Sequence, residues 1–367
     1  MRLVTLFTDT FSTPEHCRGP CGLMDFDQNI HIYEKIEVAI KMAETNAYEI
    51  VADYLLRATK YRPVIGIICG SGLSGLSKSL ENPVSIHYHD IPGFPEATVP
   101  GHSGELVFGT MDGIEVVCMR GRFHYYEGND MSKVVLPVRA MRLIGVKLLV
   151  VTNAAGALNK SYKVGDIVVI QDHFGAPLIA GNHPLRGIND DFLGPRFPSV
   201  SDAYDTRLQS IIVKCAQNIG AVDDVKTNGT YCYVSGPAYE SRAESRFLRS
   251  IGGDCVGMST VPEVITAKHC GMKILGLSFM TNKVIIEQNE GPPASHQEVL
   301  EAVEKSGAKV EKLVKSFITK SNLQSILDEV PALEYKSKSK CPVKNHTLFG
   351  LALTSYMLLT MYVFAKK

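Results

Sequence analysis

Short apolar runs without polar alternation recur along most of the chain. The first, VIGIICGSGLSGL over 64–76, ends in a turn with three glycines. Strands that do not alternate apolar and polar residues are typical of a sheet that is buried on both faces. Each run is followed by small or polar residues, so we expect the loops beyond the strand ends to hold the chemistry. Further runs of this kind lie at 114–119, 147–152, 166–170, 231–234 and 273–280.

Amphipathic stretches separate several of these runs. Residues 34–60 carry apolar positions at helical spacing, from Ile36 to Leu55, and so predict a helix before the first strand. Helical stretches also follow at 132–145 and 240–251, and a last helix is expected from about Ser295 to Ile318. Helices interleaved with buried strands predict an α/β domain whose sheet is covered by helices.

The end of the chain has a different pattern. The segment LFGLALTSYMLLTMYVFA, residues 348–365, contains no charge over 18 residues and is followed by two lysines. It meets the lower bound for a membrane-spanning helix. A buried terminal helix is the alternative, but such a helix normally shows a polar face. We therefore predict a tail anchor in an intracellular membrane, with the lysine-bearing side and the main domain cytosolic.

These patterns divide the chain into four parts. Residues 1–30 form an N-terminal extension that we expect to be poorly ordered. Its apolar start, MRLVTLF, is too brief for a secretory signal. Residues 31–322 form the main domain, and 323–347 form a polar linker that contains lysines. The predicted anchor, 348–365, completes the chain.

Composition adds two constraints. The chain has 38 basic and 38 acidic side chains, so no global charge indicates nucleic acid, and any anion must be bound by a local site. Most of the nine cysteines lie in or beside apolar runs, which predicts buried free thiols in a reducing compartment. No cysteine and histidine cluster has the spacing of a zinc site.

The turn GSGLSG at 70–75 matches the glycine pattern of a dinucleotide-binding fold. Asp90 follows Gly70 by 20 residues, as the ribose-binding acid of that fold would. However, Pro83 interrupts the intervening stretch, and the loop IPGFPEATVPGHSG follows where a second strand and helix should continue. We therefore expect no NAD site. The backbone N–H groups of the turn and the Ser71 hydroxyl are instead suited to binding one small anion.

Three further segments offer groups for the same anion. In RGRFHYYEG, Arg122 and His124 are two residues apart after a strand, so in extended backbone both point to one face. VTNAAGAL, 151–158, reads as a loop whose small residues allow a ligand to approach the backbone. In GMSTVPEV, Thr260 and Glu263 have the spacing of a capping box, which would place Ser259 at a helix N-terminus. A single phosphate could use all of these groups.

Two segments suit an organic ligand. GPAYES places Tyr239 beside Glu240 after a strand, and LSFMTNKV ends a strand in Thr281 and Asn282. A carboxylate accepts a ring N–H, an amide donates and accepts, and an aromatic ring stacks on a flat base. Each residue also has an ordinary structural interpretation, so the spacing alone does not indicate a nucleobase.

Taken together, the ordered motifs resemble purine nucleoside phosphorylase of the trimeric, 6-oxopurine-specific family. The resemblance runs from about Glu34 to Phe317. It implies a single α/β domain with a mixed, distorted central sheet covered by helices, assembled as a homotrimer. The motifs that carry it are CGSGL, FPEATVPGHSG, GRFHYYEG, VTNAAGAL, NHPLRG, RFPSVSDAYD, VSGPAYES, GMSTVPEV and MTNKV.

The resemblance also implies roles for individual residues. Catalysis would fall to Asn282, Glu240 and His124. Phosphate would be bound by Ser71, Arg122, His124, the backbone of Ala154, Ser259 and, in the loop over the phosphate, His102. The nucleoside would contact Tyr126, Phe197 from a neighbouring subunit, Tyr239, Glu240, Met258, Thr281, Asn282, Lys283 and His296. The chain departs from the family at Tyr239, where Phe is more common, and at Ala157, where a second glycine is usual.

The implied reaction is the phosphorolysis of inosine or guanosine, or their deoxy forms, in purine salvage. It requires no metal and no organic cofactor, because inorganic phosphate is a co-substrate. One alternative is methylthioadenosine phosphorylase, which reads a 6-amino group and would need an aspartate near the MTNKV strand end. A second alternative is a membrane protein that binds nucleosides without catalysis; against it, every polar group that the chemistry requires is present.

Overall fold

The computed structural model describes residues 46–70, 74–95, 103–288 and 295–337. Within these ranges no helix is both long and apolar enough to cross a membrane. The predicted anchor at 348–365 and the N-terminal extension at 1–30 lie outside the described residues, so both stay predictions. The described residues form one compact unit.

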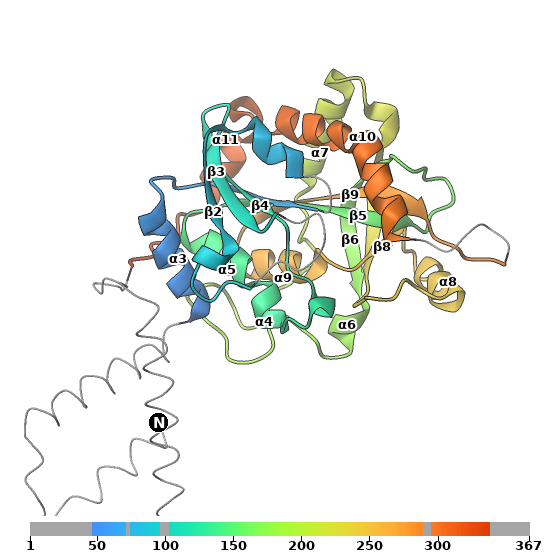
Figure 1. Ribbon diagram of the computed structural model, residues 1–367, viewed down its shortest axis with the longest axis horizontal. Coiled ribbons are helices and arrows are strands. Elements are labelled where there is room, and N and C mark those ends of the chain that lie inside the picture. The colour runs from blue at the N-terminus through green and yellow to red at the C-terminus, as the bar shows by residue number, and fades with distance from the viewer. Residues whose placement is uncertain (1–45, 71–73, 96–102, 289–294, 338–367) are drawn as a thin grey trace, which may run out of the picture. The chain divides into compact units, whose positions relative to one another are not determined.

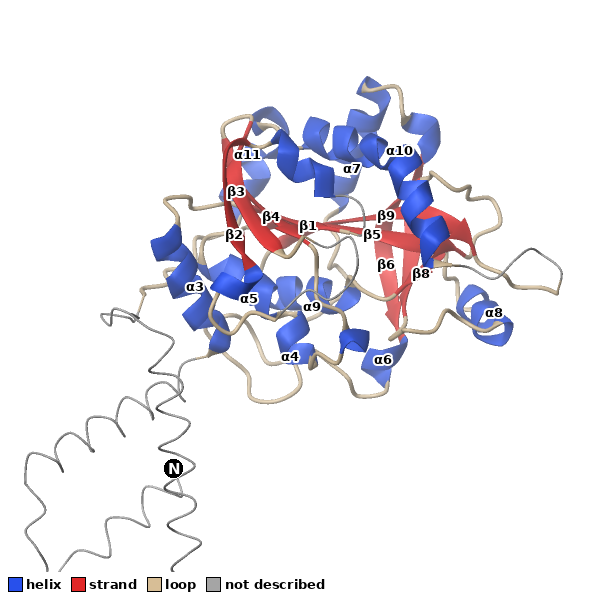
Figure 2. Cartoon of the chain, in the orientation of Figure 1, coloured by secondary structure: helices blue, strands red, loops and turns tan. Residues whose placement is uncertain are grey.

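Nine strands form one sheet, in the order β2-β3-β4-β1-β5-β8-β7-β6-β9. The last strand returns to pair with β5, so β5, β8, β7, β6 and β9 close into a ring (Figure 2). The strands are β1 (Ile65–Cys69), β2 (Glu81–His87), β3 (Glu105–Met111), β4 (Ile114–Arg120), β5 (Leu148–Ala157), β6 (Ile167–Gly175), β7 (Val225–Tyr233), β8 (Cys255–Gly257) and β9 (Lys273–Lys283).

Strand directions in this sheet are mixed. β1 runs parallel to β4 and β5, and β5 runs parallel to β9, whereas β3 is antiparallel to both β2 and β4. In the ring, β8 and β9 make further antiparallel pairs with β5 and β6. The predicted α/β class with a mixed, distorted central sheet is confirmed.

Helices cover the sheet in two layers (Figure 1). One layer holds α3 (Ala47–Ala58), α4 (Met131–Val134), α5 (Leu136–Leu143) and α9 (Val261–His269). The other holds α7 (Thr206–Asn218), α10 (His296–Phe317) and α11 (Lys320–Glu329). The remaining elements are α6 (Ala176–Ile179), α8 (Arg242–Ser250) and the 3-10 turns η1 (Ser74–Ser79), η2 (Tyr88–Asp90), η3 (Tyr125–Glu127) and η4 (Val222–Asp224).

Strand β1 shows why the strands lack alternation. All five of its residues are buried, and its side chains point by turns into two separate cores. Ile68 packs in the core under α3, α5 and α9, while Ile65 and Ile67 pack in the core under α7, α10 and α11. A strand between two helical layers needs apolar residues on both faces.

The structure also confirms that the glycine turn does not open a dinucleotide-binding unit. β1 leads to the short turn η1 and then to β2, which pairs antiparallel with β3. Asp90 ends η2 and is exposed. A βαβ unit would require a helix after β1 and, as the next strand along the chain, a parallel neighbour of β1.

Two segments differ from the sequence analysis. Residues 153–157, expected in a loop, continue β5, because pairing with β9 extends to Ala157 opposite Lys283. Part of the predicted linker is helix α11, which buries Leu323 and Ile326 in the core. Beyond it, the Tyr335 hydroxyl donates to Asp53 at 2.9 Å, so the chain after α11 is fixed against α3.

Six cysteines in the described ranges are free and buried, as predicted. They are Cys69, Cys118, Cys215, Cys232, Cys255 and Cys270. Burial raises the pKa of several of these thiols, to about 12 at Cys232 and Cys270. The Cys232 and Cys270 thiols are therefore protonated and unreactive at neutral pH.

Candidate functional site

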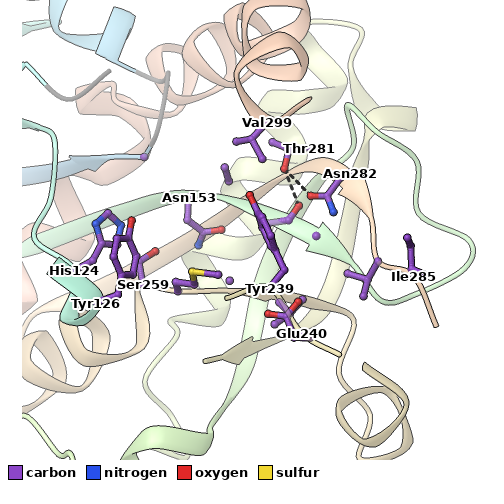
Figure 3. Close-up of a pocket in the computed structure, with 18 of the residues that line it drawn as sticks. His124, Tyr126, Asn153, Tyr239, Glu240, Ser259, Thr281, Asn282, Ile285 and Val299 are labelled. Atoms are coloured by element: carbon purple, nitrogen blue, oxygen red, sulfur yellow. Dashed lines mark hydrogen bonds between the residues drawn. The ribbon is translucent and has the colours of Figure 1, made fainter. Parts of the chain in front are cut away.

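A cavity of about 560 Å³ opens where the carboxyl ends of several strands meet. Its wall comes from segments that follow β1, β4, β7 and β8 and from the last residues of β5 and β9. Figure 3 shows His124, Tyr126 and Ser259 at one end and Asn282 and Ile285 at the other. The cavity therefore has room for an elongated ligand with two different ends.

Arg122 forms the cationic end of the cavity. Its side chain is only 2% exposed. Nη1 donates to Ser259 Oγ at 2.7 Å and to Thr260 Oγ1 at 3.1 Å, and Nη2 donates to the Thr152 carbonyl. The carboxylate of Glu263 lies 3.3 Å from Nη1. A buried guanidinium held on several sides in this way is fixed before any ligand arrives.

Thr260 has an unusual backbone. Its φ of 74° and ψ of −57° form a three-residue turn in which the Val261 N–H donates to the Ser259 carbonyl at 2.8 Å. This φ-positive γ-turn is rare and strained. The Thr260 hydroxyl accepts from Arg122 and, at 2.9 Å, from Asn153 Nδ2, and these bonds hold the strained residue in place.

The predicted capping box at this position is wrong. Thr260 does stand at the N-cap of α9, but its side chain makes no capping hydrogen bond. The hydroxyl accepts from Arg122 and Asn153 instead, and the Glu263 carboxylate faces Arg122. Thr260 and Glu263 therefore have the spacing of a capping box, but their side chains interact with residues that line the cavity.

His124 lies beside this cationic end and is 7% exposed. Its Nδ1 is 2.9 Å from Glu127 Oε1, which also accepts the His124 backbone N–H at 2.8 Å. The ring stacks on Tyr126 with centroids 4.7 Å apart. Burial lowers the pKa of His124, and this effect outweighs the opposing effect of the hydrogen bond to Glu127, so the imidazole is neutral at neutral pH.

Gly70, which lies after β1, allows the backbone of β5 to line the cavity. A Cβ at this position would lie 2.8 Å from the Asn153 Cα and 2.9 Å from the Thr152 carbonyl oxygen. The Gly70 N–H donates to Thr152 Oγ1 at 2.9 Å. The close approach of these two strands requires glycine here.

Glu240, Asn282 and Tyr239 lie toward the other end of the cavity (Figure 3). The Thr281 hydroxyl lies 3.1 Å from Asn282 Oδ1 and 3.3 Å from the Ala155 carbonyl, which fixes this strand end to β5. Burial raises the pKa of Glu240. A carboxylate, an amide and a half-exposed aromatic ring suit a flat ligand with ring N–H groups.

The structure places most of the predicted site residues on this one cavity. Phe197 and Lys283 do not line it, and the Phe197 side chain is 88% exposed. Ser71, His102 and the side chain of His296 lie outside the described residues. Those on the cavity are Arg122, His124, Tyr126, Ala154, Tyr239, Glu240, Met258, Ser259, Thr281 and Asn282.

Sequence reasoning missed several polar residues of the site. Asn153 lines the cavity and donates to Thr260, and Glu127 fixes His124. Glu127 follows His124 by three residues, a spacing that could have indicated the pair. Nothing in the sequence indicated the γ-turn at Thr260. In the described part of the chain, no group of three or more His, Cys, Asp or Glu side chains could hold a metal ion.

Comparison with known families adds a match over residues 64–319 to the model of the phosphorylase superfamily. Purine nucleoside phosphorylase of Rattus norvegicus is 49% identical over 267 residues, covering 73% of this chain and 92% of the relative. Purine nucleoside phosphorylase 1 of Bacillus subtilis is 48% identical over 258 residues, with 70% and 92% covered. The superfamily match spans the residues that line the cavity.

Solved structures show the same similarity. Schistosoma mansoni purine nucleoside phosphorylase in complex with inosine has a TM-score of 0.72 and 41% identity, covering 75% of this chain and 96% of that one. A purine nucleoside phosphorylase in complex with ribose-1-phosphate has a TM-score of 0.66 and 41% identity, with 74% and 98% covered.

We expect the Thr260 hydroxyl to stabilise the fold of this site. Thr260→Val keeps the shape of the side chain but leaves the Asn153 amide and one Arg122 bond without their acceptor. The free energy of unfolding, measured in urea, should fall by about 1–3 kcal/mol. Thr260→Ser retains the hydroxyl and should lose less. Equal losses in the two variants would show that the hydrogen bonds contribute nothing.

Proposed function

The chain belongs to the purine nucleoside phosphorylase family, and from this membership we propose that it cleaves purine nucleosides with inorganic phosphate. The substrates are inosine, guanosine and their deoxy forms, and the products are the free base and ribose or deoxyribose 1-phosphate. The observation that carries the proposal is one cavity with a fixed guanidinium at one end and a carboxylate and an amide toward the other. No metal or organic cofactor takes part.

Phosphate binds at the Arg122 end. The guanidinium fork matches two phosphate oxygens, and the backbone at Ala154 and the Ser259 hydroxyl add neutral donors. Ser71 and His102, which we assign from their sequence motifs, complete the set of phosphate-binding residues. Because Arg122 is already fixed, little ordering is needed when the anion enters.

The purine binds at the Glu240 end. As the glycosidic bond stretches, negative charge builds on the base, and the Asn282 carbonyl disperses it by accepting a hydrogen bond from N7–H. Glu240 accepts the N–H of the six-membered ring, and Tyr239 stacks on the ring face. The bond from Thr281 to Asn282 Oδ1 orients the amide for this task.

The ribose lies between the two ends, beside Tyr126 and Met258, with His296 assigned from its motif. Its anomeric carbon becomes oxocarbenium-like as the base leaves. The phosphate dianion stabilises this cation and then attacks with inversion, forming ribose 1-phosphate. Positioning and electrostatics therefore supply the catalysis.

The assembly we propose is a homotrimer. Phe197 is 88% exposed in the single chain and does not reach its own cavity. Ile179 and Ile188 belong to the same stretch and are 75% and 104% exposed. Apolar side chains left exposed in this way are typical of a protein interface. Across it, Phe197 would reach the ribose region of a neighbouring subunit.

Phosphate-dependent release of hypoxanthine from inosine is the direct test of the function. Asn282→Ala should lower kcat by about 10²–10³, because one donor or acceptor at the developing charge is lost. Asn218→Ala, on the exposed end of α7, is the matched control and should keep full activity. Turnover of methylthioadenosine in place of inosine would favour the methylthioadenosine phosphorylase alternative. Full activity of Asn282→Ala would refute the role of the amide.

The raised pKa of Glu240 generates a second test. Glu240 must be ionised to accept the ring N–H, and burial raises its pKa. As pH falls, kcat/KM for inosine at saturating phosphate should therefore decline at a higher pH than an ordinary glutamate would give. Glu240→Gln should lower kcat/KM and remove this part of the decline. An unchanged acid limb in the variant would assign that limb to another group.

We also propose that residues 348–365 anchor the protein in a membrane. The support is the sequence of this segment, 18 residues without a charge. The full-length chain should sediment with membranes, and removal of residues 342–367 should release an enzyme with unchanged turnover. A full-length chain found in the soluble fraction would contradict the anchor and leave the proposed activity untouched.

A further inference from the structure

Glu127 places its carboxylate against one nitrogen of the His124 ring. Glu127 Oε1 lies 2.9 Å from Nδ1 and accepts the backbone N–H of the same residue at 2.8 Å. The Glu127 side chain is only 3% exposed. A carboxylate oxygen at this distance needs a proton on Nδ1, because two lone pairs would otherwise face each other.

This hydrogen bond decides which atoms His124 can offer to a ligand. In a neutral imidazole one nitrogen carries the proton and the other carries a lone pair. Burial keeps the ring neutral, and Glu127 holds the proton on Nδ1. Nε2 therefore presents a lone pair, and His124 acts in the cavity as a hydrogen-bond acceptor.

Among the described residues, Arg122 and Ser259 supply donors at the anion end. Arg122 carries the positive charge, and Ser259 Oγ accepts from Arg122 Nη1 at 2.7 Å, so the Ser259 proton can be donated to a ligand. Glu263, 3.3 Å from Arg122, faces that guanidinium from α9. An acceptor on His124 beside these two donors is suited to an oxyanion that carries one proton of its own.

We propose that Glu127 makes this site selective for protonated oxyanions, so that phosphate is bound in preference to sulfate, by fixing His124 as an acceptor. The inference rests on the proposed function, which places phosphate at Arg122. Hydrogen phosphate donates its P–OH to Nε2 and accepts from Arg122 and Ser259 through its other oxygens. Sulfate has the same shape and charge but no proton at neutral pH, so one oxygen meets the Nε2 lone pair.

The test uses the full-length chain with inosine as substrate. It compares KM for phosphate with the inhibition constant of sulfate as a competitor of phosphate. Because a sulfate oxygen would leave the Nε2 lone pair without a hydrogen bond, the natural protein should prefer phosphate by at least about tenfold. Glu127→Met removes the acceptor for Nδ1–H, so the proton can move to Nε2 and donate to sulfate. The preference should then fall about tenfold.

Two variants distinguish the tautomer from general damage. Glu127→Gln keeps a carbonyl oxygen that accepts from Nδ1–H, so it should retain the preference. Glu244→Met removes the equivalent carboxylate of α8, which accepts the Ser241 N–H at 2.8 Å but touches no histidine. In Glu244→Met, the ratio of the sulfate inhibition constant to the KM for phosphate should equal that of the natural protein. A ratio that falls equally in all three variants, or stays constant in Glu127→Met, would overturn the inference.

The natural protein alone provides a second measurement if Glu127→Met does not fold. Arsenate carries a proton as phosphate does, so phosphate and arsenate should raise the melting temperature at lower concentrations than sulfate. Equal effects of sulfate and phosphate would overturn the selectivity even where inosine is cleaved. Absence of any phosphate-dependent cleavage of inosine would instead refute the proposed function.

Discussion

The buried guanidinium of Arg122 is the constraint on which the site depends. A charge that is only 2% exposed must be met mainly by protein groups, because little water reaches it. The partners come from distant segments: the Thr152 carbonyl of β5, the hydroxyls before α9 and the Glu263 carboxylate within it. Satisfying one cation therefore brings the ends of β4, β5 and α9 together, and the same contacts fix the anion end before a ligand enters.

The closed ring of strands supplies the second end of the cavity. β9 leaves the ring beside β5, with Gly156 opposite Asn282, so the strand that lines the anion end with Asn153 also supports the amide at the far end. A Cβ at Gly156 would lie 2.7 Å from Val284 and 3.3 Å from the Asn282 amide. Close packing at this crossing sets the distance between the two ends, and rigid strands hold it better than loops would.

Local patterns predicted much of this arrangement, because strands that are buried on both faces, such as β1, β4 and β9, have nearly continuous apolar sequences. The Arg122 and His124 spacing and the strand ends with Glu240 and Asn282 predicted candidates that the structure brings to one cavity. What could not be predicted depends on long-range pairing. The segment after Thr152 reads as a loop by composition and is a strand because β9 pairs with it. Thr260 adopts a γ-turn because Arg122 and Asn153 bind its hydroxyl.

Burial shifts the pKa values of groups at the two ends of the cavity in opposite directions. It lowers the pKa of His124 and raises that of Glu240, so both groups are shifted toward their neutral forms. A guanidinium cannot respond in this way, because it stays protonated at any physiological pH. Arg122 therefore remains the fixed charge of the anion end, while His124 contributes direction without charge. Coulomb attraction to Arg122 favours any small anion, and the hydrogen-bonding character of His124 decides which anion fits.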